Sequence, residues 1–117
     1  ETLDRTFASF RDNDPQAAAH VEPMEETIDR LTEEMRLRHT ERLQSGHCTI
    51  QLGFVLNDLL TNMERVSDHC SNVALCVIEA ADNSIDPHAY VQDLRANGTT
   101  FADELRDDMN RYRLPRD

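Results

Sequence analysis

The chain contains no lysine and no tryptophan, and glycine, proline and aromatic residues are scarce. All 12 basic residues are arginines, and 23 acidic residues give a formal net charge of −11 over 117 residues. A protein that binds duplex DNA needs a cationic surface to displace counterions, so this charge excludes nucleic acid as a partner. The composition instead favours cationic partners, such as metal ions, basic protein surfaces or basic loops beside a membrane. The alternative is that the charge serves solubility alone.

Long apolar runs are also missing. The longest one extends from Val73 to Ile78, far short of the roughly 20 residues that cross a bilayer. We therefore expect no direct membrane insertion of this segment. The sequence shows no secretory signal peptide, and its first residue is Glu1 rather than methionine. We expect residues 1–117 to form a single helical domain that is part of a longer protein.

Cysteine usage is limited as well. Cys48, Cys70 and Cys76 make an odd number, and no Cys-x-x-Cys motif occurs. This pattern predicts neither a disulfide framework nor a thiolate zinc site. We expect three small, buried thiols in a reducing compartment.

Turn residues divide the chain into helical segments, and no alternating Val, Ile or Thr run predicts a sheet. Strong breaks fall at Asp14-Pro15, at Ser45-Gly46 and at Asp86-Pro87, with a weaker one at Asn97-Gly98. They predict helices over about 2–12, 15–45, 49–81 and 87–113, with Thr99 or Thr100 as a cap after the weaker break. The expected fold is all-α. It is an antiparallel helical bundle with two long helices and shorter first and last helices.

Apolar residues recur at helical spacing within each segment. The second segment carries one narrow seam, and the third carries two stripes side by side, which predicts a central helix with neighbours on several sides. The seam consists of Val21, Met24, Ile28, Leu31 and Met35. The first stripe consists of Leu52, Val55, Leu59, Met63, Val66, Cys70, Val73 and Val77, and the second contains Leu56, Leu60 and Leu75. The last segment places Phe101, Leu105, Met109 and Tyr112 on one face.

Two pairs of acidic residues stand at the edge of these apolar stripes. Glu25 and Asp29 are four residues apart on the second segment, and Glu64 and Asp68 are four apart on the third, so each pair shares a helix face. A hairpin folded about Gly46 brings both pairs to the same height. Four carboxylates around one volume suit hard divalent cations, iron or manganese. The predicted metal ligands are therefore Glu25, Asp29, Glu64 and Asp68.

Salt bridges are the alternative to metal at this site, because Arg30 and Arg65 lie at the same predicted height. His69 follows Asp68 and offers a nitrogen ligand, although a lone histidine is more often structural. A catalytic carboxylate-bridged metal enzyme would need Glu-x-x-His ligands on the same face, and these are missing. No Ser-His-Asp arrangement, P-loop or dinucleotide motif occurs, so we expect no enzyme activity and no organic cofactor.

The segment from Leu60 to Ala74 resembles the signature of the PhoU family. It contains an acidic Glu-Arg-x-x-Asp at Glu64–Asp68, followed by Asn72-Val73-Ala74, and Glu25–Asp29 resembles the matching acidic motif of the preceding helix. With Asp68-His69-Cys70, the chain is most similar to the PhoU-like domain at the cytoplasmic C-terminus of bacterial Na+/phosphate cotransporter-type proteins.

The resemblance implies a helical bundle that regulates phosphate transport from the cytoplasmic side of the cell membrane. Its expected partners are the transmembrane part of the same protein and further copies of itself. PhoU proteins can hold metal clusters, often of iron, through paired Glu-x-x-x-Asp motifs, which implies metal at the four acids. The alternative is a metal-free helical dimerisation module, in which the Val21–Met35 seam and the third segment bury a partner surface.

Overall fold

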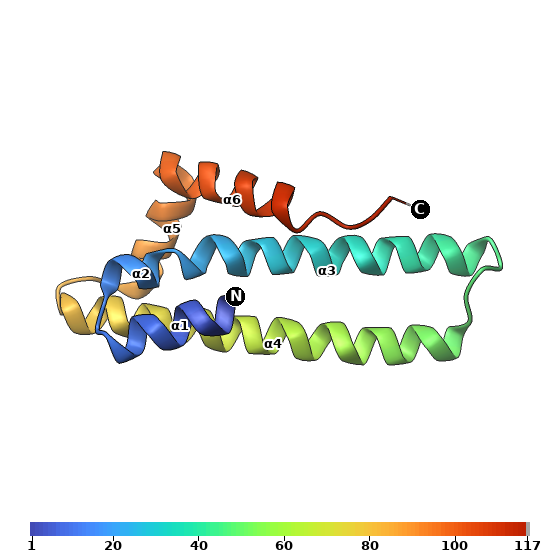
Figure 1. The fold of residues 1–117 in the computed structure, drawn as a ribbon, viewed down its shortest axis with the longest axis horizontal. Helices are drawn as coiled ribbons and strands as arrows, with labels where there is room; N and C mark the ends of the chain where they lie inside the picture. Colours follow the sequence, from blue (N-terminus) through green and yellow to red (C-terminus); the bar gives the residue numbers. More distant parts are fainter. Residues whose placement is uncertain (117) are drawn as a thin grey trace.

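The computed structural model describes residues 1–116, with Asn97 described by its backbone alone, and this part of the chain folds into six helices (Figure 1). The helices are α1 (Thr2–Arg11), α2 (Pro15–Ala19), α3 (Val21–Gln44), α4 (Ile50–Ala81), α5 (Pro87–Asn97) and α6 (Thr99–Arg111). This confirms the all-α prediction. No helix in residues 1–116 is both long and apolar enough to cross a lipid bilayer.

The two long helices, α3 and α4, form an antiparallel hairpin along the whole length of the molecule (Figure 1). Gly46 ends α3 in the left-handed conformation, with φ at 79°. The amide of Gly46 donates to the carbonyl of Leu43, and the amide of His47 donates to the carbonyl of Arg42. These two bonds form a Schellman motif, the helix end for which glycine is best suited.

Helix starts follow the predicted caps in two cases. The side chain of Asp14 accepts from the amides of Gln16 and Ala17, and Asp86 accepts from the amide of His88. Each cap is followed by a proline at the first helical position, where its missing N–H costs nothing. The predicted cap at Thr99 or Thr100 is wrong, because α6 begins at Thr99 itself and Gly98 precedes it without a side-chain cap.

The predicted helix over 15–45 is divided at His20 into α2 and α3. Pro23 gives the physical reason. A proline within a continuous helix has no N–H for the carbonyl four residues earlier, here that of Ala19, whereas it is tolerated in a first turn. The break places Pro23 in the first turn of α3 and lets α2 turn away from the α3 axis.

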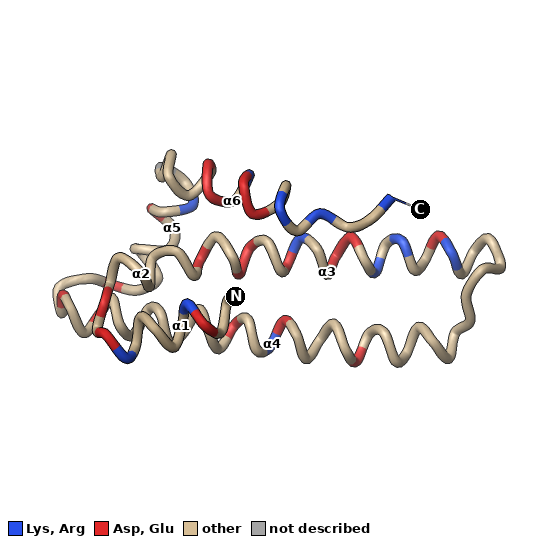
Figure 2. The backbone as a smooth tube through the Cα atoms, viewed as in Figure 1, with Lys and Arg blue, Asp and Glu red and all other residues tan. Residues whose placement is uncertain are grey.

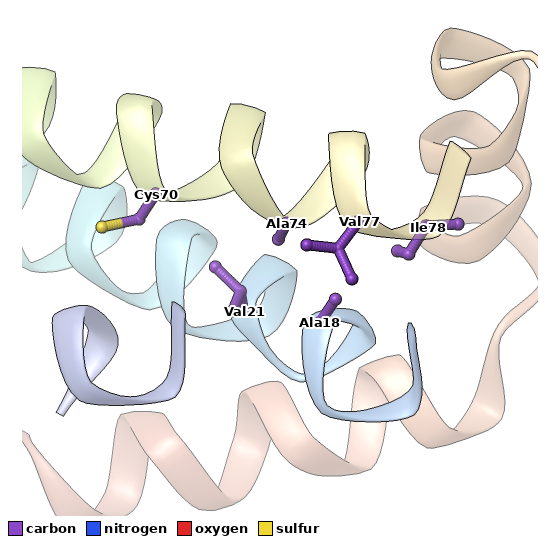
Figure 3. Close-up of a cluster of buried hydrophobic side chains, with 6 residues drawn as sticks. All are labelled: Ala18, Val21, Cys70, Ala74, Val77 and Ile78. Atoms are coloured by element: carbon purple, nitrogen blue, oxygen red, sulfur yellow. The ribbon is translucent and has the colours of Figure 1, made fainter. Parts of the chain in front are cut away.

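The buried core lies at one end of the hairpin, where α1 and α2 pack against α4 (Figure 1). Its apolar cluster comes from α2, α3 and α4 and consists of Ala18, Val21, Cys70, Ala74, Val77 and Ile78 (Figure 3). The three cysteines are free, as predicted, but Cys70 alone is buried, and Cys76 is exposed. Helix α6 covers α3 with Phe101 and Leu105 buried, as its predicted apolar face requires.

The prediction that the third segment is a central helix with neighbours on several sides is confirmed, because α4 contacts α1, α2, α3 and α5. These neighbours cover only part of its length. Of its first apolar stripe only Cys70 and Val77 are buried, and Leu52 and Val55 remain 58% and 65% exposed. The molecule measures 53 × 25 × 22 Å with a radius of gyration of 16.4 Å, against about 13 Å for a compact chain of this length. The end of the hairpin near Gly46 therefore projects beyond the core.

Candidate metal centre

Three of the four predicted carboxylates meet between α3 and α4. Glu25, Asp29 and Asp68 each offer an oxygen, and these oxygens all lie within 4.8 Å of one another. Glu25 is buried, Asp29 is half-buried and Asp68 is exposed, so the cluster opens from the helix interface toward solvent. The helical spacing of four and the height match across the hairpin together bring these residues into one place.

Glu64 is the predicted ligand that the structure places elsewhere. Its carboxylate forms an ion pair with Arg36. The Arg36 hydrogen bond is the main reason that the pKa of Glu64 is lowered, and Thr32 adds to it. Since Arg36 also contacts Asn57 and Thr61, it links α3 to α4 about two turns beyond the three-carboxylate cluster.

Arg95 of α5 reaches the same cluster from its buried side. Its guanidinium contacts Glu25 and Glu22 at 2.8 Å each and Glu26 at 2.6 Å. Glu22 is held in turn by the hydroxyl of Ser71 in α4, at 2.7 Å. One arginine thus ties the first two turns of α3 to α5.

The local charges make Glu25 the most perturbed acid of the cluster. Burial, followed by the charges of Asp29 and Glu22, raises the pKa of Glu25 to about 8, and Arg95 offsets only part of this increase. Burial also raises the pKa of Asp29, where a hydrogen bond with Glu25 opposes the effect and the charges of Asp68 and Glu64 add to it. At neutral pH a proton is therefore retained between Glu25 and Asp29.

This donor set fits a hard cation. Around Ca2+ each oxygen ligand lies at about 2.3–2.6 Å, so two ligands of one ion stand at most about 5 Å apart. The three oxygens satisfy this limit as they stand, and a smaller ion would need a slight contraction. All three ligands are carboxylates, which suits calcium, magnesium, manganese or iron better than a soft metal. A bound cation would take the place of the shared proton.

The sequence-based alternatives are only partly realised. Arg30 pairs with Glu26 at 2.9 Å rather than with the predicted ligands, and within residues 1–116 no ion pair is seen for Arg65. His69 is exposed and is not one of the three grouped residues. The arginines that do neutralise predicted ligands are Arg95 and Arg36, and neither was found from the sequence, because no local spacing links α5 to α3.

A family model, the PhoU domain, matches residues 1–77. The chain belongs to the PhoU domain family. The matched region of this PhoU domain runs from α1 into α4 and includes all four predicted ligands, whereas Arg95 lies outside it. Comparison with curated proteins and with solved structures gives no significant match. Membership of the PhoU family indicates a regulatory domain of phosphate homeostasis.

Proposed function

We propose that this PhoU domain is a non-catalytic regulatory module that acts on a phosphate transport protein through protein contacts. A divalent cation bound by Glu25, Asp29 and Asp68 changes the strength of this action. The observation that carries the proposal is the meeting of these three carboxylates between α3 and α4, inside the region that matches the family model.

Regulation by contact needs a part of the domain whose position depends on the cation. Glu25 belongs both to the three-carboxylate cluster and to the set of acids that holds Arg95. Occupancy of the site and attachment of α5 therefore depend on the same carboxylate. Glu22 and Glu26 keep Arg95 in place when Glu25 is drawn toward Asp68, so we expect α5 to be loosened rather than released.

We further propose that the regulated partner is the transmembrane part of a Na+/phosphate cotransporter-like protein, with this domain on the cytoplasmic side of the cell membrane. The motif Asp68-His69-Cys70 supports this choice. Transport regulation is measured as phosphate uptake in cells that carry the parent protein with and without the domain. Unchanged uptake and unchanged response to phosphate supply after deletion would refute the regulatory role.

The cation site is tested by isothermal titration calorimetry of the purified chain with Ca2+, Mn2+ and, without oxygen, Fe2+. We expect binding to the native chain and its loss in Asp68→Asn, which removes one of three charged ligands. Asp68 is exposed, so the substitution should leave the fold intact, as circular dichroism will verify.

Glu41→Gln is the matched control. Glu41 is an exposed acid on α3, far along the helix from the cluster, and its replacement removes the same charge. Equal loss of affinity in both variants would mean that the cations bind to the general acidic surface. Absence of binding to the native chain would favour the metal-free dimerisation module, in which Arg95 and Arg36 neutralise Glu25 and Glu64.

A further inference from the structure

The half of the hairpin near Gly46 has no buried residue of its own. From Glu33 to Leu59, along the second half of α3 and the first third of α4, every side chain is exposed or half-buried. Figure 1 shows why, since α1, α2, α5 and α6 lie along the other part of the hairpin. Only the segment after α6 reaches this half, where the carbonyl of Pro115 accepts from Arg38 at 2.6 Å. Two antiparallel helices that pack only against each other bury too little apolar surface to be stable by themselves.

The exposed surface of α4 carries a regular apolar pattern. Leu52, Leu59, Val66 and Val73 follow one another at intervals of seven residues and are 58%, 50%, 46% and 37% exposed. Val55 and Met63 stand between them, at 65% and 49% exposed. We call these six residues the α4 stripe. A seven-residue apolar repeat is the seam of a coiled coil, so the stripe has the pattern of a helix–helix interface.

The stripe forms the apolar centre of a contact. Its six side chains expose on the order of 500 Å2, near the upper end for a single patch on a monomeric protein. A stable complex buries about 800 Å2 per partner, so the polar side chains that border the stripe would supply the rest of the interface.

Five of the six stripe residues, all except Val73, are placed symmetrically about Leu59. Val55 and Met63 stand four residues before and after Leu59, and Leu52 and Val66 stand seven before and after it. When two α4 helices cross antiparallel at Leu59, Leu52 of one copy faces Val66 of the other, and Val55 faces Met63. A two-fold interface requires such self-complementarity, and an unrelated partner helix would not impose it.

The charge distribution permits two copies to meet here, although the chain carries a net charge of −11. Most acids lie toward the other end of the molecule, and α4 between Ile50 and Met63 holds a single charge, Asp58 (Figure 2). On the adjoining part of α3, from Glu33 to Gln44, three arginines balance three acids: Arg36, Arg38, Arg42, Glu33, Glu34 and Glu41. This end of the hairpin is therefore where two such acidic molecules repel each other least.

We propose that two copies of this chain associate through the α4 stripe, antiparallel and centred on Leu59, so that two bare hairpins combine into a four-helix bundle. This interface does not depend on the cation site. The Val21–Met35 seam is not part of it, since Val21 and Met24 are already buried within the chain.

The test is sedimentation velocity of the purified chain in a buffer with chelator. We expect a dimer, and we expect Leu59→Glu and Leu59→Arg each to halve the mass, because both place two like charges at the two-fold axis. Leu59 is half exposed, so neither change should unfold the monomer, as circular dichroism will check. Mixing the two variants should restore a dimer, because Glu and Arg then face each other.

Gln51→Glu is the control, since it adds the same charge to an exposed position of α4 outside the stripe, and it should remain dimeric. Three results would overturn the proposal. They are a native chain that stays monomeric at high micromolar concentration, a dimer that persists in Leu59→Glu, and a mixture of the two charged variants that stays monomeric. A monomer that binds an apolar dye would mean that the stripe receives a different helix.

Discussion

Buried polar atoms that lack a hydrogen-bond partner lower the stability of a folded domain. The hydroxyl of Ser67 in α4 is one of them, because it is buried and has no hydrogen-bond partner. Ser67 lies beside a groove of about 400 Å3 that Leu59, Met63 and Val66 also line. A buried polar atom without a partner has lost its contact with water and gained nothing in exchange.

We therefore predict that Ser67→Ala stabilises the domain. The change removes the unpaired hydroxyl, worth about 1 kcal/mol or more, and alanine adds a few tenths of a kcal/mol of helix propensity. Urea unfolding followed by circular dichroism measures the effect. Ser9→Ala is the matched control, because Ser9 is equally buried but donates to the carbonyl of Thr6 at 2.8 Å. A loss of stability in Ser67→Ala would show that this hydroxyl does have a partner.

At the level of helices, turn residues were sufficient to predict most helix boundaries. Features that depend on contacts between distant segments could not be predicted in this way. Asp14-Pro15, Gly46 and Asp86-Pro87 each act on their own neighbours, so their effects can be found from local sequence. The break at His20 depends on Pro23, which the apolar spacing of the segment concealed. The exposure of the α4 stripe is not a local property at all, because it depends on which other helices reach α4.

The same distinction applies to the candidate site. Three ligands came together because the hairpin has one turn and a fixed rise per residue, which the sequence specifies. The ion pairs of Arg36 and Arg95 instead depend on side-chain reach between helices, and Arg95 comes from α5, about 70 residues after its partners. Glu64 is thereby drawn to Arg36 and away from the other three acids.

The turn between α3 and α4 offers a test of helix termination. A side chain at Gly46 would meet no atom within 4 Å, so space is not the constraint there, whereas a φ of 79° is. We predict that Gly46→Ala costs about 1–2 kcal/mol of unfolding free energy, the strain of a left-handed residue with a Cβ. Gly46→Asn should lose less, because asparagine tolerates this conformation better.

Thermal unfolding of both variants measures the difference. Equal losses for Ala and Asn would show that the cost comes from something other than backbone conformation. If neither variant loses stability, the left-handed backbone at Gly46 imposes no strain on a residue with a Cβ, and the prediction is wrong.

For the molecule as a whole, the pKa shifts predict an unusual dependence of stability on pH. The pKa of Glu25 rises from an unfolded value of about 4.3 to about 8 in the folded chain, chiefly through burial, and burial raises the pKa of Asp29 and Asp108 too. The folded state then binds protons that the unfolded state has released. Stability from these groups is complete below pH 4 and is lost as the pH rises toward 8.

Glu26 and Glu64 act in the opposite sense. Arg30 and Arg95 outweigh burial at Glu26, and Arg36 acts at Glu64, so the pKa of each is lowered. Their contribution is present above their unfolded pKa and disappears as the pH falls through the lowered value. Stability should therefore peak in the weakly acidic range and decline across neutral pH, where Glu25 titrates.

A cation at the candidate site would reverse that decline, because it needs the deprotonated form of Glu25 that the folded chain otherwise resists. We predict that chelator-treated protein melts at lower temperature at pH 8 than at pH 6, and that Mn2+ or Ca2+ raises the melting temperature more at pH 8. Glu25→Gln should melt at nearly the same temperature at both pH values and gain little from the ions. If the melting temperatures of the native chain and of Glu25→Gln change with pH in the same way, the proton that the folded chain retains is not bound at Glu25. The proposed competition between proton and cation at this carboxylate is then wrong.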